Sequence, residues 1–402
     1  MSEQKYIALI DCDSFFVSCE RTFNENLNNK AVCVVSGDRG CVVARSKEAK
    51  QMGIPMGLPL FMAKEQFPKC IYINANHCNY LKISKEIMSI LKEFSPNVEV
   101  YSIDEAFVDL TGLSRLYKMN YYKMAQYIRN LILEKTKIPV SIGISRTKPL
   151  AKLASDKSKN SKNHICITGK CGISKLLKQS EISEIWGIGR KLGPKLKSFG
   201  IYTAFDYVQK NDVWLKSRFG KNGLELKYEL LGTLINKVSN KIDMPKSISD
   251  TKSFSEFSSD LNFLKNELQI HIHSACRKLR NACGKATIAG IILKTKDFKV
   301  FFEKINLPHE TNFEFEISRE VFPLLDKMFN SKIIYRSIGI YLAGIEPEEK
   351  QQLQLFGDSI KREKNEKLAK SLDKLEEKFG RNIVKPGFIN DVPVKQDFLT
   401  KQ

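Results

Sequence analysis

The sequence YIALIDCD, residues 6–13, decides how the first part of the chain folds. Its apolar run from Tyr6 to Ile10 would be apolar on both faces of a strand, which is typical of a strand buried in the centre of a sheet. Asp11 then places a carboxylate at the end of that strand, where a ligand can reach the edge of the sheet. We therefore expect a domain built around this strand, with Asp11 at the edge of the sheet that a ligand can reach.

The rest of the first 165 residues alternates between strand-like and helix-like runs. The runs VEVYS and EAFVDL read as further strands, and they flank the dipeptide Asp104-Glu105. This alternation predicts an α/β catalytic domain. Other strands are predicted at 30–37, 69–75 and 140–145, and helices at 43–53, 80–94 and 121–135.

A different organisation follows. Short helices with glycine turns are expected from about residue 173 to about 235. From 245 to 346 the order of strand, helix, two strands, helix and strand resembles a split β-α-β-β-α-β unit, with its second helix at about 319–330. The tail after residue 347 is charged and has one helical stretch at about 359–379. The sequence thus predicts a multidomain chain of α/β and α+β class.

The charge balance points to a polyanionic partner. The 402 residues include 65 Lys and Arg against 45 Asp and Glu, a formal net charge of +20, and the pI is about 9.4. A surface this basic suits nucleic acid. No run of ~18 apolar residues predicts a membrane span, and the apolar run at 6–10 is too short for a signal peptide. We expect a cytoplasmic protein.

The cysteines do not predict a metal site. None of the ten forms a C-x-x-C pair, and the five histidines offer no zinc spacing. We expect reduced, mostly buried thiols and no structural zinc.

Three acidic residues form the candidate catalytic centre. Adjacent residues of a strand face opposite ways, but a turn between VEVYS and EAFVDL would bring Asp104 and Glu105 near Asp11. Three converging carboxylates repel each other unless cations lie between them, and such oxygen ligands suit Mg²⁺. Two ions ~3.5–4 Å apart can activate an attacking oxygen and stabilise a leaving one.

The alternative is a set of ordinary strand-end and turn acids, which are common at such positions. Asp13 and Asp109 are further candidates for the same site. We expect instead that Asp13 caps a helix and that Asp109 finishes a strand.

Five stretches of the sequence form an ordered set of motifs. They are IDCDSFFVSCE (10–20), GCVVARSKEAKQMGIPMG (40–57), YSIDEAFVDLTG (101–112), SIGISRTKPLAKLASDKSK (141–159) and IWGIGRKLGPKLKSFGI (185–201). In this order they resemble the motifs of the Y-family translesion DNA polymerases, and the resemblance covers roughly residues 5–350. Within the family, residues 12–20, GCVVAR and WGIGR look most like the UmuC type, the catalytic subunit of DNA polymerase V, and less like the DinB type.

The resemblance implies a right-hand polymerase with palm, fingers, thumb and little finger. The thumb would contain a helix-hairpin-helix, and the little finger would be the split β-α-β-β-α-β unit. The implied domains are a palm at 1–19 and 76–165, fingers at 20–75, a thumb at 166–240, a little finger at 245–346, and a tail at 347–402 with a clamp-binding peptide at 352–356.

The resemblance also implies the reaction. Asp11, Asp104, Glu105 and the backbone carbonyl of Cys12 would hold two Mg²⁺ ions. A primer 3′-hydroxyl would attack the α-phosphate of a deoxynucleoside triphosphate and release pyrophosphate. Phe16 occupies the steric-gate position, where its ring would reject a ribose 2′-hydroxyl.

Several groups are candidates for the triphosphate. Backbone N–H groups near Phe15 can hold phosphate oxygens at a helix start, and Lys159 matches the palm lysine of the family. In the fingers motif, Lys47 stands where the family has Tyr and Lys50 where it has Arg, so Arg45, Lys47 and Lys50 remain alternatives.

DNA contacts are expected in two further regions. Gly187 and Gly189 would let backbone N–H groups approach a phosphate, with Arg190, Lys191 and Lys195 adding charge. In the little finger, Lys294, Lys296 and Lys299 either contact the DNA backbone or protect a solvated strand edge. The peptide with Gln352, Leu353, Leu355 and Phe356 resembles the sliding-clamp ligand of bacterial polymerases.

The function implied is error-prone, DNA-templated DNA synthesis past lesions in the SOS response, without a proofreading exonuclease. Expected partners are primer-template DNA, the clamp, a UmuD′ dimer and RecA, in the cytoplasm on the nucleoid. The alternatives are a non-catalytic DNA-binding scaffold that retains the fold and a DinB-type polymerase acting alone. The intact Asp11, Asp104 and Glu105 argue against the scaffold.

Overall fold

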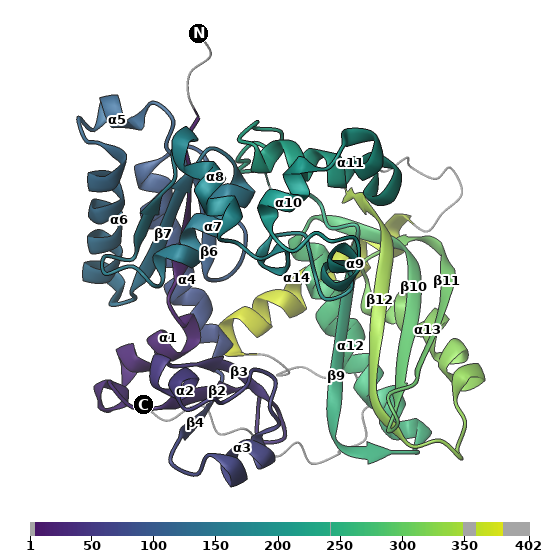
Figure 1. Cartoon of the computed structure of the whole chain (residues 1–402). Helices are drawn as coiled ribbons and strands as arrows, with labels where there is room; N and C mark the ends of the chain where they lie inside the picture. The colour runs from purple at the N-terminus through teal and green to yellow at the C-terminus, as the bar shows by residue number, and fades with distance from the viewer. Residues whose placement is uncertain (1–4, 242, 349–358, 381–402) are drawn as a thin grey trace. The chain divides into compact units, whose positions relative to one another are not determined.

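The computed structural model describes residues 5–241, 243–348 and 359–380, with backbone only for 359–363, and Figure 1 shows its helices and strands. The chain divides between residues 241 and 242 into two compact units. Each unit has a hydrophobic core of its own. None of the described helices combines the length and the apolar character that crossing a membrane requires.

A five-stranded sheet forms the centre of the first unit, in the order β5-β6-β1-β7-β8. β1 (Ile7–Cys12) pairs antiparallel with β6 (Glu105–Asp109) on one side and with β7 (Val140–Ser145) on the other. β5 (Val98–Val100) and β8 (Ile165–Ile167) form the edges. All six residues of β1 are buried, so the prediction of a central buried strand is confirmed.

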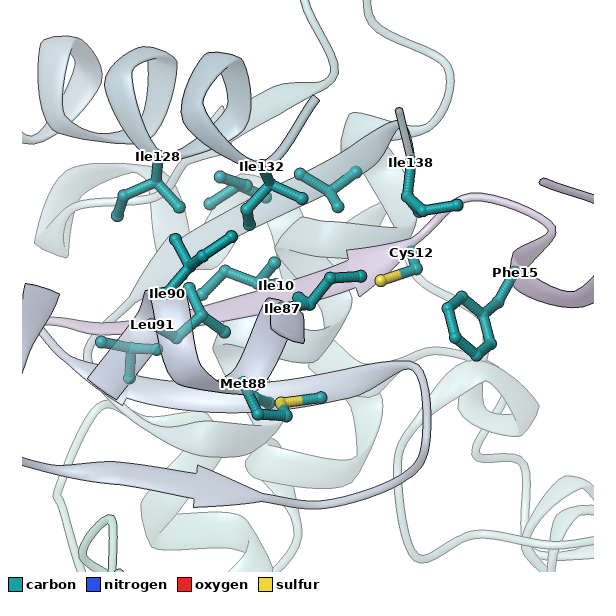
Figure 2. Packing of buried hydrophobic residues seen from close by; sticks show 14 of the residues in the cluster. Ile10, Cys12, Phe15, Ile87, Met88, Ile90, Leu91, Ile128, Ile132 and Ile138 are labelled. Atoms are coloured by element: carbon teal, nitrogen blue, oxygen red, sulfur yellow. The ribbon is translucent and has the colours of Figure 1, made fainter. Parts of the chain in front are cut away.

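Helices cover both faces of this sheet. On one face, α4 (His77–Phe94) and α6 (Tyr121–Thr136) supply isoleucines that pack with Ile10 and Cys12 of β1, as Figure 2 shows. On the other face, α7 (Lys148–Ser158) packs against β1 and β7. Apolar burial from both sides, at about 25 cal/mol per Å², fixes β1 and therefore the position of Asp11 near its end.

Gly143 allows α7 to approach β7 closely. A Cβ at this position would lie 2.0 Å from the backbone nitrogen of Ser155 and 2.3 Å from the carbonyl oxygen of Ala151. Because both neighbours are backbone atoms, no other residue fits here without moving the helix. This packing holds Lys152 within α7 and Lys159 at its C-terminal end.

A three-stranded sheet in the order β3-β2-β4 forms a smaller layer of the first unit. β2 (Val32–Val35) pairs antiparallel with β3 (Val42–Arg45) and parallel with β4 (Ile71–Asn74). The short helices α2 (Lys47–Gln51) and α3 (Leu60–Gln66) accompany it.

The predicted helix at 43–53 is therefore wrong in its first half. Near its start, Ala44 and Arg45 pair with Val34 and Cys33 of β2 instead. Ser46 then caps α2, since its side chain accepts a hydrogen bond from the backbone N–H of Ala49 at 3.1 Å.

Short helices dominate residues 170–230, as the sequence predicts. They enclose a separate core that includes Ile182, Leu196 and Tyr207. The longest of these helices changes direction at Gly220, which has a φ of 66°. The helices of this region are α8 (Lys170–Lys178), the 3₁₀ turn η2 (Ile182–Glu184), α9 (Leu192–Ser198), α10 (Ala204–Gln209) and α11 (Asp212–Leu230).

Three short elements occur earlier in the first unit. They are α1 (Phe15–Phe23), η1 (Glu25–Leu27) and α5 (Leu113–Leu116).

The second unit has the predicted strand and helix order. Its four antiparallel strands follow the order β11-β10-β12-β9. The helix expected at 319–330 begins five residues earlier and includes Pro323. The elements are β9 (Ser247–Ser258), α12 (Leu261–Asn281), β10 (Gly284–Thr295), β11 (Val300–Thr311), α13 (Glu314–Met328) and β12 (Tyr335–Pro347).

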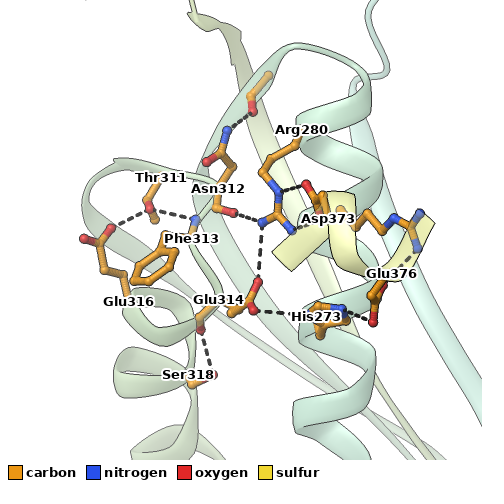
Figure 3. Close-up of polar contacts among 12 residues, drawn as sticks. His273, Arg280, Thr311, Asn312, Phe313, Glu314, Glu316, Ser318, Asp373 and Glu376 are labelled. Atoms are coloured by element: carbon orange, nitrogen blue, oxygen red, sulfur yellow. Dashed lines mark hydrogen bonds and ion pairs between the residues drawn. The ribbon is translucent and has the colours of Figure 1, made fainter. Parts of the chain in front are cut away.

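The helix predicted in the tail is present as α14 (Ser359–Phe379), and ion pairs attach it to α12 (Figure 3). Arg280 makes two hydrogen bonds to Asp373, at 2.7 and 2.8 Å. His273 lies between two buried carboxylates, with Nδ1 3.1 Å from Glu314 and Nε2 3.0 Å from Glu376. The second unit therefore includes the tail helix.

Candidate active site

The antiparallel ladder between β1 and β6 places two of the predicted acids opposite each other. Asp11 is the register partner of Glu105. The backbone N–H of Cys12 donates a hydrogen bond to the carbonyl oxygen of Asp104 at 2.9 Å. A tight turn precedes β6, because the N–H groups of Tyr101 and Ser102 both donate to the carbonyl oxygen of Glu105. The structure thus brings Asp11, Asp104 and Glu105 to one end of the central strands.

Each of the three carboxylates has a polar partner. The ammonium group of Lys159 donates to Asp11 Oδ2 at 2.9 Å, and that of Lys152 donates to Glu105. The hydroxyl group of Ser102 donates to Asp104 Oδ1 at 2.8 Å. Within the described residues, no three His, Cys, Asp or Glu side chains already converge as a ready-made set of metal ligands. Lysine charges compensate the acids in this state.

The pKa of Asp11 reports the electrostatics of this cluster. Burial raises it to about 6, against an opposing effect of Lys159, and the negative charges of Glu105 and Asp104 raise it further. Burial alone would lower the pKa of Lys159, but its ion pair and hydrogen bond with Asp11 outweigh burial and raise it. Mutually repelling carboxylates of this kind favour added positive charge, and their hard oxygens fit Mg²⁺.

The two further acids have other contacts. Asp13 accepts a hydrogen bond from Ser141 at 2.7 Å and lies 3.3 Å from His164 Nδ1. The expectation that its side chain caps a helix is wrong, since the residue before α1 is Ser14 and Asp13 is held by β7 and the segment before β8. Asp109 ends β6, as expected, and its carboxylate accepts from the N–H of Thr111 at 2.9 Å.

The start of α1 positions the two adjacent phenylalanines differently. The Phe15 ring is buried in the core. Only the backbone N–H of this residue, at the start of the helix, remains as a group that could bind a ligand. The Phe16 ring is half-buried and stacks on Tyr80, with ring centroids 4.6 Å apart and an interplanar angle of 17°. The Tyr80 hydroxyl donates to Glu20 at 2.6 Å. Tyr80 therefore holds the Phe16 ring in place.

Three cations surround the start of α1. The Lys50 ammonium group donates to the Ser14 hydroxyl at 3.1 Å. Burial lowers the pKa of Lys50, and the positive charges of Arg45 and Lys159 lower it further. Arg45 and Lys159 are therefore close enough to Lys50 to repel its charge. The guanidinium of Arg45 is held by the carbonyl oxygen of Ile54. Lys47 is exposed at the first turn of α2.

A hydrogen bond connects the turn before the acids to residue 186. Trp186 Nε1 donates to the Tyr101 hydroxyl at 2.9 Å, and their rings meet edge to face. The Lys152 ammonium lies 5.1 Å from the centroid of the Tyr101 ring. Sequence patterns missed Tyr80, Tyr101, Lys152 and Trp186, although the last three lie within the quoted motifs.

The candidate DNA-binding residues lie on exposed surface. Gly187 has a φ of 95°, and added Cβ atoms at Gly187 and Gly189 would meet nothing within 4 Å, so this turn is open to a phosphate. Exposed neighbours supply positive charge, namely Arg190, Lys191 and Lys195. In the second unit, Lys296 and Lys299 are exposed and Lys294 lies over the Phe298 ring at 4.9 Å. Gln352, Leu353, Leu355 and Phe356 lie outside the described residues.

Comparisons with known proteins find relatives along most of the chain. Residues 10–156 match the impB/mucB/samB family, 245–355 its C-terminal domain, and 171–201 the IMS family HHH motif. The chain is 30% identical over 391 residues to "Protein UmuC" of Salmonella typhimurium, covering 94% of this chain and 92% of that protein. It is 32% identical to "DNA polymerase IV" of Dehalococcoides mccartyi, covering 94% and 96% of the two chains.

Solved structures show the same fold. A Y-family DNA polymerase chimera of Dbh and Dpo4 aligns with a TM-score of 0.72 at 26% identity, over 85% of this chain and 99% of that one. The insertion ternary complex of Dbh DNA polymerase aligns over the same shares with a TM-score of 0.57 at 26% identity.

Proposed function

The chain belongs to the impB/mucB/samB family of Y-family translesion DNA polymerases, and from this premise we propose that Asp11, Asp104 and Glu105 are its catalytic carboxylates. It is a DNA-directed DNA polymerase of the UmuC type with the multidomain fold of the family. Its substrates are primer-template DNA and deoxynucleoside triphosphates. The observation that carries the site proposal is the pairing of Asp11 with Glu105, with Asp104 bonded next to it through Cys12.

The family generally depends on divalent metal, and these residues fit two Mg²⁺ ions. Asp11, Asp104 and Glu105 would hold the ions together with the carbonyl oxygen of Cys12. When bound, the ions would supply activation of the primer hydroxyl and charge neutralisation at the phosphates. The chain's own part is to hold these oxygens on rigid strands and to release Lys159 and Lys152 from their pairs with Asp11 and Glu105. The freed Lys159 can then bind a phosphate oxygen.

The nucleotide contacts follow from the groups around α1. We infer that Lys50 and Lys159 bind the triphosphate, together with backbone N–H groups near Phe15, because Lys50 contacts Ser14 and lies near Lys159. Arg45 and Lys47 are secondary candidates: Arg45 is already held by Ile54, and Lys47 lies on the exposed first turn of α2. The ring of Phe16, supported by Tyr80, would exclude a ribose 2′-hydroxyl.

The domains are assigned by the same resemblance to the polymerase family. The five-stranded sheet and its helices form the palm at 1–19 and 76–165, and the small sheet forms the fingers at 20–75. The helical region at 166–240 is the thumb, and 245–346 is the little finger. DNA phosphates would contact Gly187, Gly189 and the basic residues beside them, and Lys294 and Lys296 in the second unit. Such contacts ignore base sequence, as a polymerase requires.

Further partners are proposed from the UmuC resemblance. Residues 352–356 would bind the sliding clamp, and a UmuD′ dimer and RecA would support lesion bypass in the SOS response, in the cytoplasm on the nucleoid. A second candidate is a DinB-type polymerase acting alone, and the 32% identity to a DNA polymerase IV favours it. The UmuC-type polymerase would need UmuD′ and RecA for lesion bypass, whereas the DinB-type polymerase would need neither.

Primer extension on a template with a single lesion separates the candidates. We expect Mg²⁺-dependent extension that rises strongly when UmuD′ and RecA are both added. Full bypass by the chain alone would support the DinB-type alternative. No incorporation under any of these conditions, on lesion-free template as well, would contradict polymerase activity of this chain.

A further inference from the structure

Two cysteines meet inside the small three-stranded sheet. Cys33 lies on the central strand β2, and Cys70 directly precedes β4, which pairs with β2. Their sulfur atoms are 3.6 Å apart and share a hydrogen bond. Cys33 is 0% and Cys70 6% exposed, so the pair is enclosed within the molecule. All ten cysteines are free thiols in this structure.

The surroundings make the two thiols chemically unequal. The shared hydrogen bond raises the pKa of Cys33 and lowers that of Cys70. The thiolate is the nucleophile of cysteine chemistry. Cys70 is the more exposed of the two, at 6% against 0% for Cys33. A small oxidant that enters from this side meets the Cys70 sulfur first.

We propose that Cys33 and Cys70 form a redox-modifiable dithiol, which a hydroperoxide converts into an intramolecular disulfide. The Cys70 thiolate attacks one oxygen of hydrogen peroxide, and the O–O bond breaks. Cys70 becomes a sulfenic acid, and the other oxygen leaves as hydroxide, which takes up the proton that the Cys70 thiol lost and becomes water. The Cys33 sulfur then attacks the Cys70 sulfur. The S–S bond forms, the S–O bond breaks, and the Cys33 proton leaves with the hydroxyl as a second water.

The sheet connects this pair to the candidate nucleotide site. Cys33 is the register partner of Arg45 across the β2–β3 ladder. A disulfide bond is about 2 Å long, so closing it pulls Cys33 toward Cys70 and away from β3. Arg45 is thereby shifted relative to α2, which carries Lys50. This consequence rests on the proposed function, whereas formation of the disulfide does not.

The test oxidises the full-length protein with hydrogen peroxide after complete reduction. Digestion under non-reducing conditions and mass spectrometry then map the crosslinks. We expect a peptide pair that joins Cys33 to Cys70, with the loss of two hydrogen atoms and reversal by dithiothreitol. Cys33→Ala and Cys70→Ala should each abolish it, and Cys171→Ser, which changes an exposed thiol, should not. Because the wild-type map is decisive, a misfolded variant does not obscure the result.

Absence of the 33–70 link, with Cys70 recovered as thiol or as sulfinic acid, would overturn the proposal. The same oxidised sample is assayed for primer extension. We expect the KM for nucleotide to rise at least about threefold and to recover on reduction, an effect of about 0.65 kcal/mol. A mapped disulfide with unchanged KM would overturn the link to Arg45. A chain without polymerase activity would contradict the proposed function and leave the crosslink result intact.

Discussion

Asp11 and Glu105 are direct partners across the β1–β6 ladder, although 94 positions separate them in the sequence. Side chains opposite each other in an antiparallel pair have Cβ atoms about 4.5–5.5 Å apart. Two carboxylates at that separation repel each other, and burial raises the pKa of Asp11 to about 6, with Glu105 contributing. The structure compensates them with Lys159 and Lys152. This repulsion supports the proposal that divalent cations bind here.

Replacing Phe16 with alanine should admit ribonucleotides. The stacked pair of Phe16 and Tyr80 presents a rigid ring, and its removal takes away the obstacle to a 2′-hydroxyl. We expect the ratio of ribonucleotide to deoxynucleotide kcat/KM to rise at least about 100-fold, or about 2.7 kcal/mol. Tyr80→Phe is the matched control, because it keeps the supporting ring and removes only the bond to Glu20. Unchanged sugar selection in Phe16→Ala would remove Phe16 from the gate role.

Lys50→Ala should weaken nucleotide binding. Lys47 and Lys50 are both exposed, but Lys50 reaches Ser14 at the start of α1, where the positive charges of Arg45 and Lys159 act on it. Loss of one charged hydrogen bond, at about 1.5–3 kcal/mol, should raise the KM for nucleotide at least about tenfold. Lys47→Ala should change it less than about threefold. Steady-state kinetics with equal effects of both variants would contradict the assignment of Lys50.

The attachment of α14 should weaken as pH rises. A hydrogen bond to Glu314 raises the pKa of His273 against the effect of burial, and Glu376 adds to it (Figure 3). The folded pKa exceeds the unfolded value of about 6.5, so the stabilisation is complete below about pH 6.5 and is lost as pH rises through the folded pKa. The other charged groups at this junction are Arg277, which bonds to Glu376, and Arg280, which bonds to Asp373.

Hydrogen exchange of the α14 amides, corrected for the intrinsic rate at each pH, measures this effect. We expect protection to fall as pH rises above about 6.5 in the wild type. His273→Gln should show weaker protection at low pH and no such fall. The ion pair of Lys285 and Glu366, at 2.7 Å, is a second attachment of α14 that both proteins retain. Protection that stays constant with pH in the wild type would exclude the role of His273.

The spacing of apolar residues predicted most helices and strands, because it shows directly which side chains are buried. The apolar run of β1 predicted a central strand, and VSIGIS coincides with β7. The helix expected at 43–53 was wrong because Val42–Arg45 pairs with β2, a partner that a local window does not include. Asp13 was misassigned as a cap for the same reason, since its partner Ser141 is 128 positions away.

Long-range contacts account for what the sequence did not predict. Tyr80 supports Phe16 from α4, and Trp186 bonds Tyr101 across 85 positions, so neither role follows from residue spacing. The docking of α14 depends on ion pairs that span 81 to 103 positions. The candidate acids could be predicted from the sequence because they lie in the family motifs. The pairing of Asp11 with Glu105 was seen only in the β1–β6 ladder of the structure.

The single-turnover rate of primer extension by Asp104→Asn, with saturating Mg²⁺, tests the central claim most directly. This change keeps the size of the side chain and removes its charge. We predict a rate at least about 1000-fold below wild type, or about 4.1 kcal/mol, with DNA affinity within about twofold. Asp13→Asn, a nearby acid held by Ser141 and His164, should stay within about tenfold of wild type. Extension by Asp104→Asn within tenfold of the wild-type rate would contradict the assignment of these acids as the catalytic centre.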